Sequence, residues 1–117
     1  METIIKINGI VHGLNGSNGL IRQHWAAAKK TKQKYLYLIR SQTKNRHKGA
    51  VIIEYIGYKS ILMDWDNFSA SFKHLGDSLV NAKVIKDDKP DIIVKFIPKQ
   101  IKCKRKEQKV IIIIRDL

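Results

Sequence analysis

Two aspartates, Asp64 and Asp66, stand two positions apart in the segment MDWDNFSASFK, in a chain with few acidic residues. If this segment is extended, residues i and i+2 project to the same face, about 6.5–7 Å apart along the strand. Two carboxylates at that distance repel each other by about 2–3 kcal/mol at an effective dielectric constant of about 20. A divalent cation between them would remove this repulsion, and Mg²⁺ prefers oxygen ligands. The spacing therefore indicates a metal site, with one alternative: the aspartates cap a helix or pair with the abundant lysines.

The charge of the chain points to a polyanionic partner. The 117 residues include 23 Lys and Arg but only 10 Asp and Glu, which gives a formal net charge of +13. No acidic residue lies between Glu2 and Glu54, and six of the ten fall between Asp64 and Asp91. A basic chain around an acidic focus fits an enzyme that acts on phosphodiesters, so nucleic acid is the expected partner. From charge alone, a ribosome-associated protein and an anionic membrane surface remain alternatives.

Length and composition indicate a small intracellular protein. We expect a single domain over residues 1–117, because the length is typical of one domain and 44% of the residues are apolar. No apolar run approaches the roughly 18–20 residues of a membrane span, and METIIKING lacks the layout of a signal peptide. The single cysteine, Cys103, excludes an internal disulfide and a cysteine zinc cluster. The expected location is the cytoplasm, without a membrane partner.

The pattern of apolar residues predicts the secondary structure. Strands are expected at residues 3–11, 50–58, 92–97 and 110–117, and SILMDWD is expected to extend as a further strand. A helical period over residues 20–41 predicts a first helix, which Lys32 would interrupt unless its side chain snorkels. Asn67 is the expected N-cap of a second helix that ends near residues 81–83. The expected buried face of this helix consists of Phe68, Phe72, Leu75 and Leu79.

The order β, α, β, β, α, β, β predicts an α/β (α+β) domain, with a mixed β-sheet and two main helices packed on it. The last two strands are apolar almost without interruption, which is typical of strands covered on both faces. Trp65 should face the core, on the side of the strand opposite to Asp64 and Asp66.

The combination of DWDN, KHLGDSL and VIKDD resembles the RusA family of Holliday junction resolvases, which are small phage and prophage endodeoxyribonucleases. The similarity is best over residues 50–97. The resemblance implies that Asp64, Asp66 and Asp88 bind a metal ion, Mg²⁺ or Mn²⁺, and that Lys73 completes the catalytic group. It also implies a homodimer in the bacterial or host cytoplasm that resolves four-way DNA junctions by paired nicks, in recombination and repair. Lys73 lies three residues beyond the position at which the family lysine is expected.

Basic residues outside this group are candidates for holding DNA. Collectively they should neutralise several phosphates and make binding steeply salt-dependent. The segment Lys102–Lys106 is either a further basic patch or a solvated hairpin tip. The alternative function is a non-catalytic, basic nucleic-acid-binding module whose acidic cluster is structural, and a third interpretation is a relative that has lost activity. The individual candidates for DNA binding are Lys29, Lys30, Lys32, Lys34, Arg46 and Lys48.

Overall fold

The computed structural model describes residues 1–9, 11 and 25–117. The loop expected at residues 12–20 and the expected start of the first helix, residues 20–24, lie outside the described residues. The elements in chain order are β1 (Glu2–Asn8), α1 (Trp25–Gln42), β2 (Val51–Lys59), α2 (Trp65–Ala70), α3 (Lys73–Asn81), β3 (Ile93–Lys102), the 3₁₀ turn η1 (Arg105–Glu107) and β4 (Lys109–Asp116).

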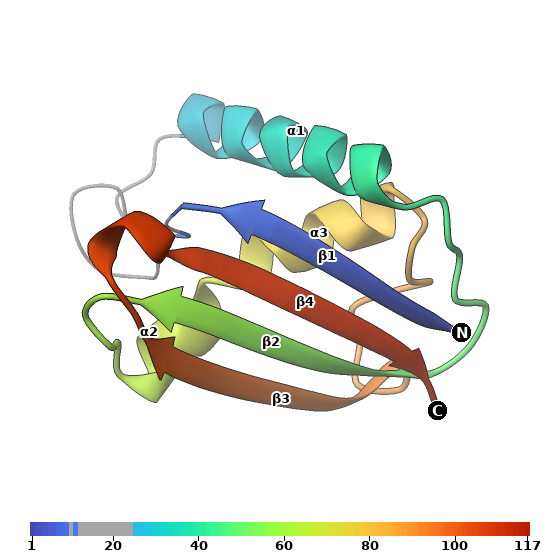
Figure 1. Ribbon diagram of the computed structural model, residues 1–117. Coiled ribbons are helices and arrows are strands. Elements are labelled where there is room, and N and C mark those ends of the chain that lie inside the picture. Colours follow the sequence, from blue (N-terminus) through green and yellow to red (C-terminus); the bar gives the residue numbers. More distant parts are fainter. Residues whose placement is uncertain (10, 12–24) are drawn as a thin grey trace.

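These strands form one mixed sheet in the order β1-β4-β2-β3. β4 is antiparallel to both β1 and β2, whereas β2 and β3 are parallel. Parallel neighbours need a crossover connection, and α2 and α3 lie within that connection. Figure 1 shows α2 and α3 behind the sheet and α1 along the side of β1. The predicted α+β class, a mixed sheet with helices packed on it, is confirmed.

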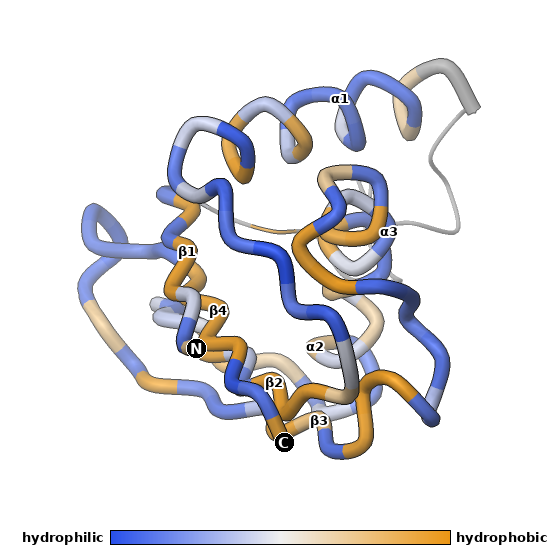
Figure 2. Tube along the Cα trace, turned by 90° about the vertical axis from the view of Figure 1, so that its right-hand side faces the viewer, coloured by the Kyte–Doolittle hydropathy of each residue, from blue (hydrophilic) through white to orange (hydrophobic). Residues whose placement is uncertain are grey.

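One face of the sheet forms the hydrophobic core. Along β2 buried and half-buried side chains alternate, and Val110, Ile112 and Ile114 of β4 are fully buried. Figure 2 shows the described helices on this side. The prediction that the last two strands are covered on both faces is wrong. Consecutive isoleucines in β4 point to opposite faces, and the edge strand β3 leaves Val94 and Ile101 each 43% exposed.

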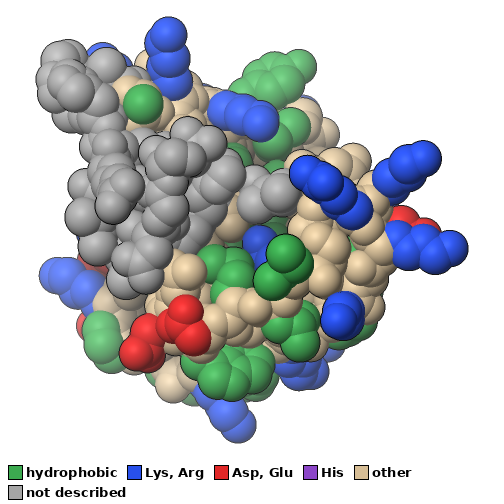
Figure 3. All heavy atoms as spheres, turned by 90° about the vertical axis from the view of Figure 1, so that its left-hand side faces the viewer, with side chains coloured by type: hydrophobic (Ala, Val, Ile, Leu, Met, Phe, Trp, Pro, Cys, Tyr) green, Lys and Arg blue, Asp and Glu red, His purple; other side chains and the backbone are tan. Residues whose placement is uncertain are grey.

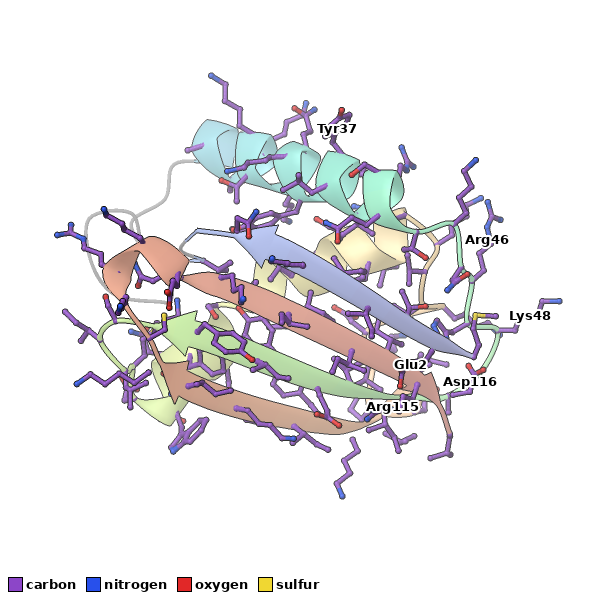
Figure 4. All side chains as sticks on the ribbon, in the orientation of Figure 1. Glu2, Tyr37, Arg46, Lys48, Arg115 and Asp116 are labelled. Atoms are coloured by element: carbon purple, nitrogen blue, oxygen red, sulfur yellow. The ribbon has the colours of Figure 1, made fainter. Side chains whose placement is uncertain are left out.

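Charged pairs cover part of the open face of the sheet. The guanidinium of Arg115 bonds Glu2 at 2.7 Å and Glu54 at 2.6 Å, and Lys99 bonds Glu54 at 3.0 Å. Figure 4 shows Glu2 and Arg115 side by side at the end of the sheet where the two chain termini lie. Hydrogen bonds from Lys99 and Arg115 lower the pKa of Glu54. The network neutralises these carboxylates.

The segment that leads into α2 is not a strand. Residues 60–64 have no strand pairing, so the expected strand SILMDWD is absent from the sheet. Instead, the Gln100 side chain bonds both the backbone N–H and the carbonyl of Met63, each at 2.8 Å. Trp65 begins α2 and is 56% exposed, so its predicted core position is also wrong. The prediction of a strand here is wrong, and hydrogen bonds to the Gln100 side chain take the place of strand pairing at Met63.

An aromatic cluster fixes the helical connection on the sheet. Phe68, Phe72, Leu75 and Leu79 are all buried, as predicted, and α3 ends at Asn81 as expected. The helix breaks between Ala70 and Lys73 into α2 and α3. The Tyr55 ring stacks on Phe68 with centroids 4.8 Å apart and meets Phe72 edge-on at 5.1 Å. The Tyr55 hydroxyl shares a 2.8 Å hydrogen bond with Ser71, at the break itself.

Helix α1 packs against α3, and its side chains Tyr35 and Ile39 are buried in the core. Lys32 does not break α1, which runs unbroken over its described range. Its ammonium instead reaches Asp77 of α3 at 3.0 Å, and its backbone carbonyl accepts a bond from Ser78 at 3.2 Å. Among the described residues, no helix is both long and apolar enough to cross a membrane.

Candidate functional site

The two aspartates lie at the start of α2, where the helix itself uses one of them. Asp64 is the N-cap: its backbone is extended, and Oδ2 accepts the Asn67 N–H at 3.1 Å. The prediction that Asn67 is the N-cap is therefore wrong, because the helix begins about one turn earlier in the chain. Asp66 lies in the first helical turn and is exposed. Because Asp66 is helical, the same-face spacing of an extended strand does not apply. Both carboxylates lie where the positive end of the helix dipole stabilises negative charge.

A hollow of about 630 Å³ opens beside this helix start. We call it the Asp64 hollow, because Asp64 and Asn67 line one side of it. Lys59, the last residue of β2, and Arg105 of η1 also line it. Lys59 is only 4% exposed, and its ammonium donates to the Val11 carbonyl at 3.3 Å. Burial lowers the pKa of Lys59. The hollow thus combines a carboxylate with two cationic side chains.

A second hollow, of about 400 Å³, lies on the other end of the helical connection. Lys73, at the start of α3, and Asp88, from the α3–β3 connection, both line it together with Asp77 and Ser69. We call it the Lys73 hollow. Lys73 and Asp88, two of the four residues that the resemblance assigns, therefore line the same hollow and carry opposite charges.

The predicted metal ligands are not gathered at one point. Within residues 1–9, 11 and 25–117, no three His, Cys, Asp or Glu side chains are grouped closely enough to hold a metal ion. Asp64 lines one hollow and Asp88 the other. Asp64 and Asp66 remain as neighbouring carboxylates, and Mg²⁺ commonly takes only one or two protein carboxylates, with waters and phosphate oxygens in its other positions. Asp66 is not among the residues that line the Asp64 hollow, and Asp88 lines the other hollow, so the metal-binding role of these aspartates stays a prediction.

The candidate DNA-binding residues fall into separate groups. Lys29, Lys30 and Lys34 are exposed on α1, whereas Lys32 is engaged with Asp77. Figure 4 shows Arg46 and Lys48 projecting outward at the end of the sheet near the chain termini, opposite to the end where α2 begins. The structure therefore does not place Arg46 and Lys48 beside Asp64 and Asp66.

Sequence reasoning missed Lys59 and Arg105 as neighbours of Asp64. Lys59 ends an apolar strand, and the strict alternation of β2 puts position 59 on the buried face, which was a usable signal. Arg105 lies some 40 residues from Asp64 in sequence, so only the folded chain brings it there. Figure 3 views this end of the molecule and shows Lys and Arg side chains spread around its outline, with acidic side chains at the lower left and at the right edge.

In comparisons with known proteins, no protein-family model and no curated protein matches the chain.

Proposed function

We propose that this protein is a metal-dependent endodeoxyribonuclease that resolves four-way DNA junctions, in the manner that its resemblance to the RusA family suggests. The observation that carries the proposal is the Asp64 hollow: a carboxylate at a helix start and two cationic side chains, Lys59 and Arg105, line one concavity. A phosphodiester needs cations for its phosphate oxygens, and a carboxylate pair can hold the divalent ion that assists its hydrolysis.

Each residue has a role that follows from its position. Asp64 and Asp66 would hold Mg²⁺ (or Mn²⁺), which lowers the pKa of bound water and polarises a phosphoryl oxygen. Arg105 offers a forked guanidinium suited to a phosphate. Lys73 and Asp88, in the Lys73 hollow, lie further along the helical connection, where Lys73 would contact a neighbouring phosphate. A two-fold junction has two equivalent strands to cut, so a homodimer is the matching assembly.

One observation favours the second candidate, a non-catalytic nucleic-acid-binding module. Asp64 has a structural task as the N-cap of α2, and Asp88 lines a different hollow. Under this alternative the acidic residues stabilise the helical connection, and the basic surface binds DNA without cutting it.

Cleavage of a labelled synthetic four-way junction, with Mg²⁺ or with EDTA, separates the two functions. Asn caps helices about as well as Asp, so Asp64→Asn keeps the cap but removes the charge. We expect Asp64→Asn and Asp66→Asn each to reduce the cutting rate at least about 100-fold, with melting temperatures and junction affinity close to those of the parent protein. Asp91→Asn is the matched control, because Asp91 is an exposed acidic residue that lines neither hollow, and this variant should cut normally.

The result that contradicts the nuclease is tight junction binding by the parent protein with no cutting in either Mg²⁺ or Mn²⁺. Normal cutting by both Asp64→Asn and Asp66→Asn would contradict the assignment of the carboxylates.

A further inference from the structure

Two more hollows lie at the same end of the sheet as the Asp64 hollow. One, of about 540 Å³, is lined by Tyr58, Lys102, Lys104 and Lys109 among others. The next, of about 710 Å³, is lined by Lys6, Arg105 and Lys106 and shares Lys109 with the first. Arg105 then lines both this second hollow and the Asp64 hollow. Each hollow therefore shares a basic residue with the next, in a series that ends at the Asp64 hollow. We call its cationic residues the basic track: Lys6, Lys102, Lys104, Arg105, Lys106 and Lys109.

The positive charge of the basic track is hardly neutralised by the protein. Glu107 is the acidic residue that lines its two hollows. In the described part of the chain, none of the six basic side chains forms an ion pair; Lys109 instead lies over the Tyr58 ring, 4.8 Å from its centroid. Concave surfaces lined by one sign of charge focus the potential and concentrate counter-ions. Such a surface is suited to bind a polyanion.

The turn that carries the track is anchored, which argues against a freely solvated hairpin tip. The Gln108 side chain donates to the Arg105 carbonyl at 3.2 Å and accepts from both the N–H and the hydroxyl of Ser60, also at 3.2 Å. The Gln108 carbonyl accepts the Gly9 N–H at 2.9 Å. These bonds tie η1 to the ends of β1 and β2. A pre-positioned charge loses less entropy when it binds a ligand.

We propose that the basic track binds the phosphodiester backbone of one DNA strand and guides it over η1 to Asp64. This inference rests on the proposed nucleic-acid function and adds where the strand runs and which residues hold it. Arg105 is the residue of the basic track that also lines the Asp64 hollow. The Tyr58 ring, already in contact with Lys109, offers a face against which the sugar or base of the strand can pack.

The test measures binding of a fluorescent four-way DNA junction by the full chain in EDTA, over roughly 0.05–0.3 M KCl. The variant Arg105→Gln/Lys106→Gln removes two charges from the track. The matched control, Lys86→Gln/Lys95→Gln, removes two charges from exposed positions outside its hollows. Each lost phosphate contact lowers the slope of log K against log salt by about 0.9. We expect the track variant to lose about 2 units of slope and to bind about 10- to 60-fold more weakly at 0.1 M salt.

The control should change the slope by less than about 0.5. All four substituted positions are exposed, so thermal melts should show the parent fold in both variants. Equal slopes for the track variant and the control would overturn the basic track. Because EDTA removes divalent ions, this outcome is independent of cutting. If the track variant has a lower slope but the parent protein never cuts DNA, the basic track is supported and the nuclease is contradicted. If the slopes are equal but the parent protein cuts DNA, the nuclease is supported and the basic track is contradicted.

Discussion

Substitution of Gly57 tests how the start of α2 is held. Gly57 lies on the buried face of β2, and Phe68, one turn after Asp64, packs directly on it. A Cβ added at position 57 would lie 2.8 Å from Phe68 Cζ and even closer to Cε1. The Phe68 ring is fully buried and stacked on Tyr55, so it cannot swing away freely. We expect Gly57→Ala to lower the free energy of unfolding by about 1–3 kcal/mol, the usual cost of overpacking a core.

Urea denaturation followed by circular dichroism measures the effect, and two further variants make it specific. Gly49→Ala is the matched control, because a Cβ there meets nothing within 4 Å; it should be neutral or stabilise by up to about 1 kcal/mol. Phe68→Leu lacks the ring atoms that would clash, so the double variant Gly57→Ala/Phe68→Leu should lose at least about 1 kcal/mol less than the sum of the single losses. Strict additivity, or a Gly57→Ala protein as stable as Gly49→Ala, would refute the reasoning.

Two ionisable groups provide further predictions. Burial lowers the pKa of Lys59 below 10.5, so its charged ammonium disfavours folding at neutral pH. We therefore expect Lys59→Met to raise the free energy of unfolding at pH 7 by about 1 kcal/mol. Urea denaturation at a series of pH values should show this gain shrink as the pH rises towards 10.5. Hydrogen bonding from His47, together with the N-terminal amine, lowers the pKa of Asp116 from 3.8. The stability that this shift contributes is present above about pH 4 and is lost as the pH falls below it. When the free energy of unfolding is measured at decreasing pH, Asp116→Asn should therefore lose less stability than the parent protein. Identical pH profiles for the two proteins would contradict this role.

Local periodicity made the elements of this fold predictable. The alternation of β2 and the spacing of Phe68, Phe72, Leu75 and Leu79 depend on neighbours within a few residues, and the structure agrees with both. The same logic failed for residues 60–64. These residues include a short apolar run that a strand could accommodate, but they pair with no strand, and the Gln100 side chain, from β3, bonds the Met63 backbone instead. A contact between residues so far apart in sequence leaves no periodic signal.

The sequence by itself determined the charge of this protein, its α+β class and the close spacing of Asp64 and Asp66 in the chain. The tertiary structure alone decided which distant cation lies beside Asp64. The topology of the fold brings η1 to the start of α2, and so puts Arg105 in the hollow that Asp64 lines. The same topology sends Arg46 and Lys48 to the opposite end of the sheet. Charge content is a property of composition, whereas the neighbours of a charge are set by how distant segments pair and pack, which no local pattern encodes.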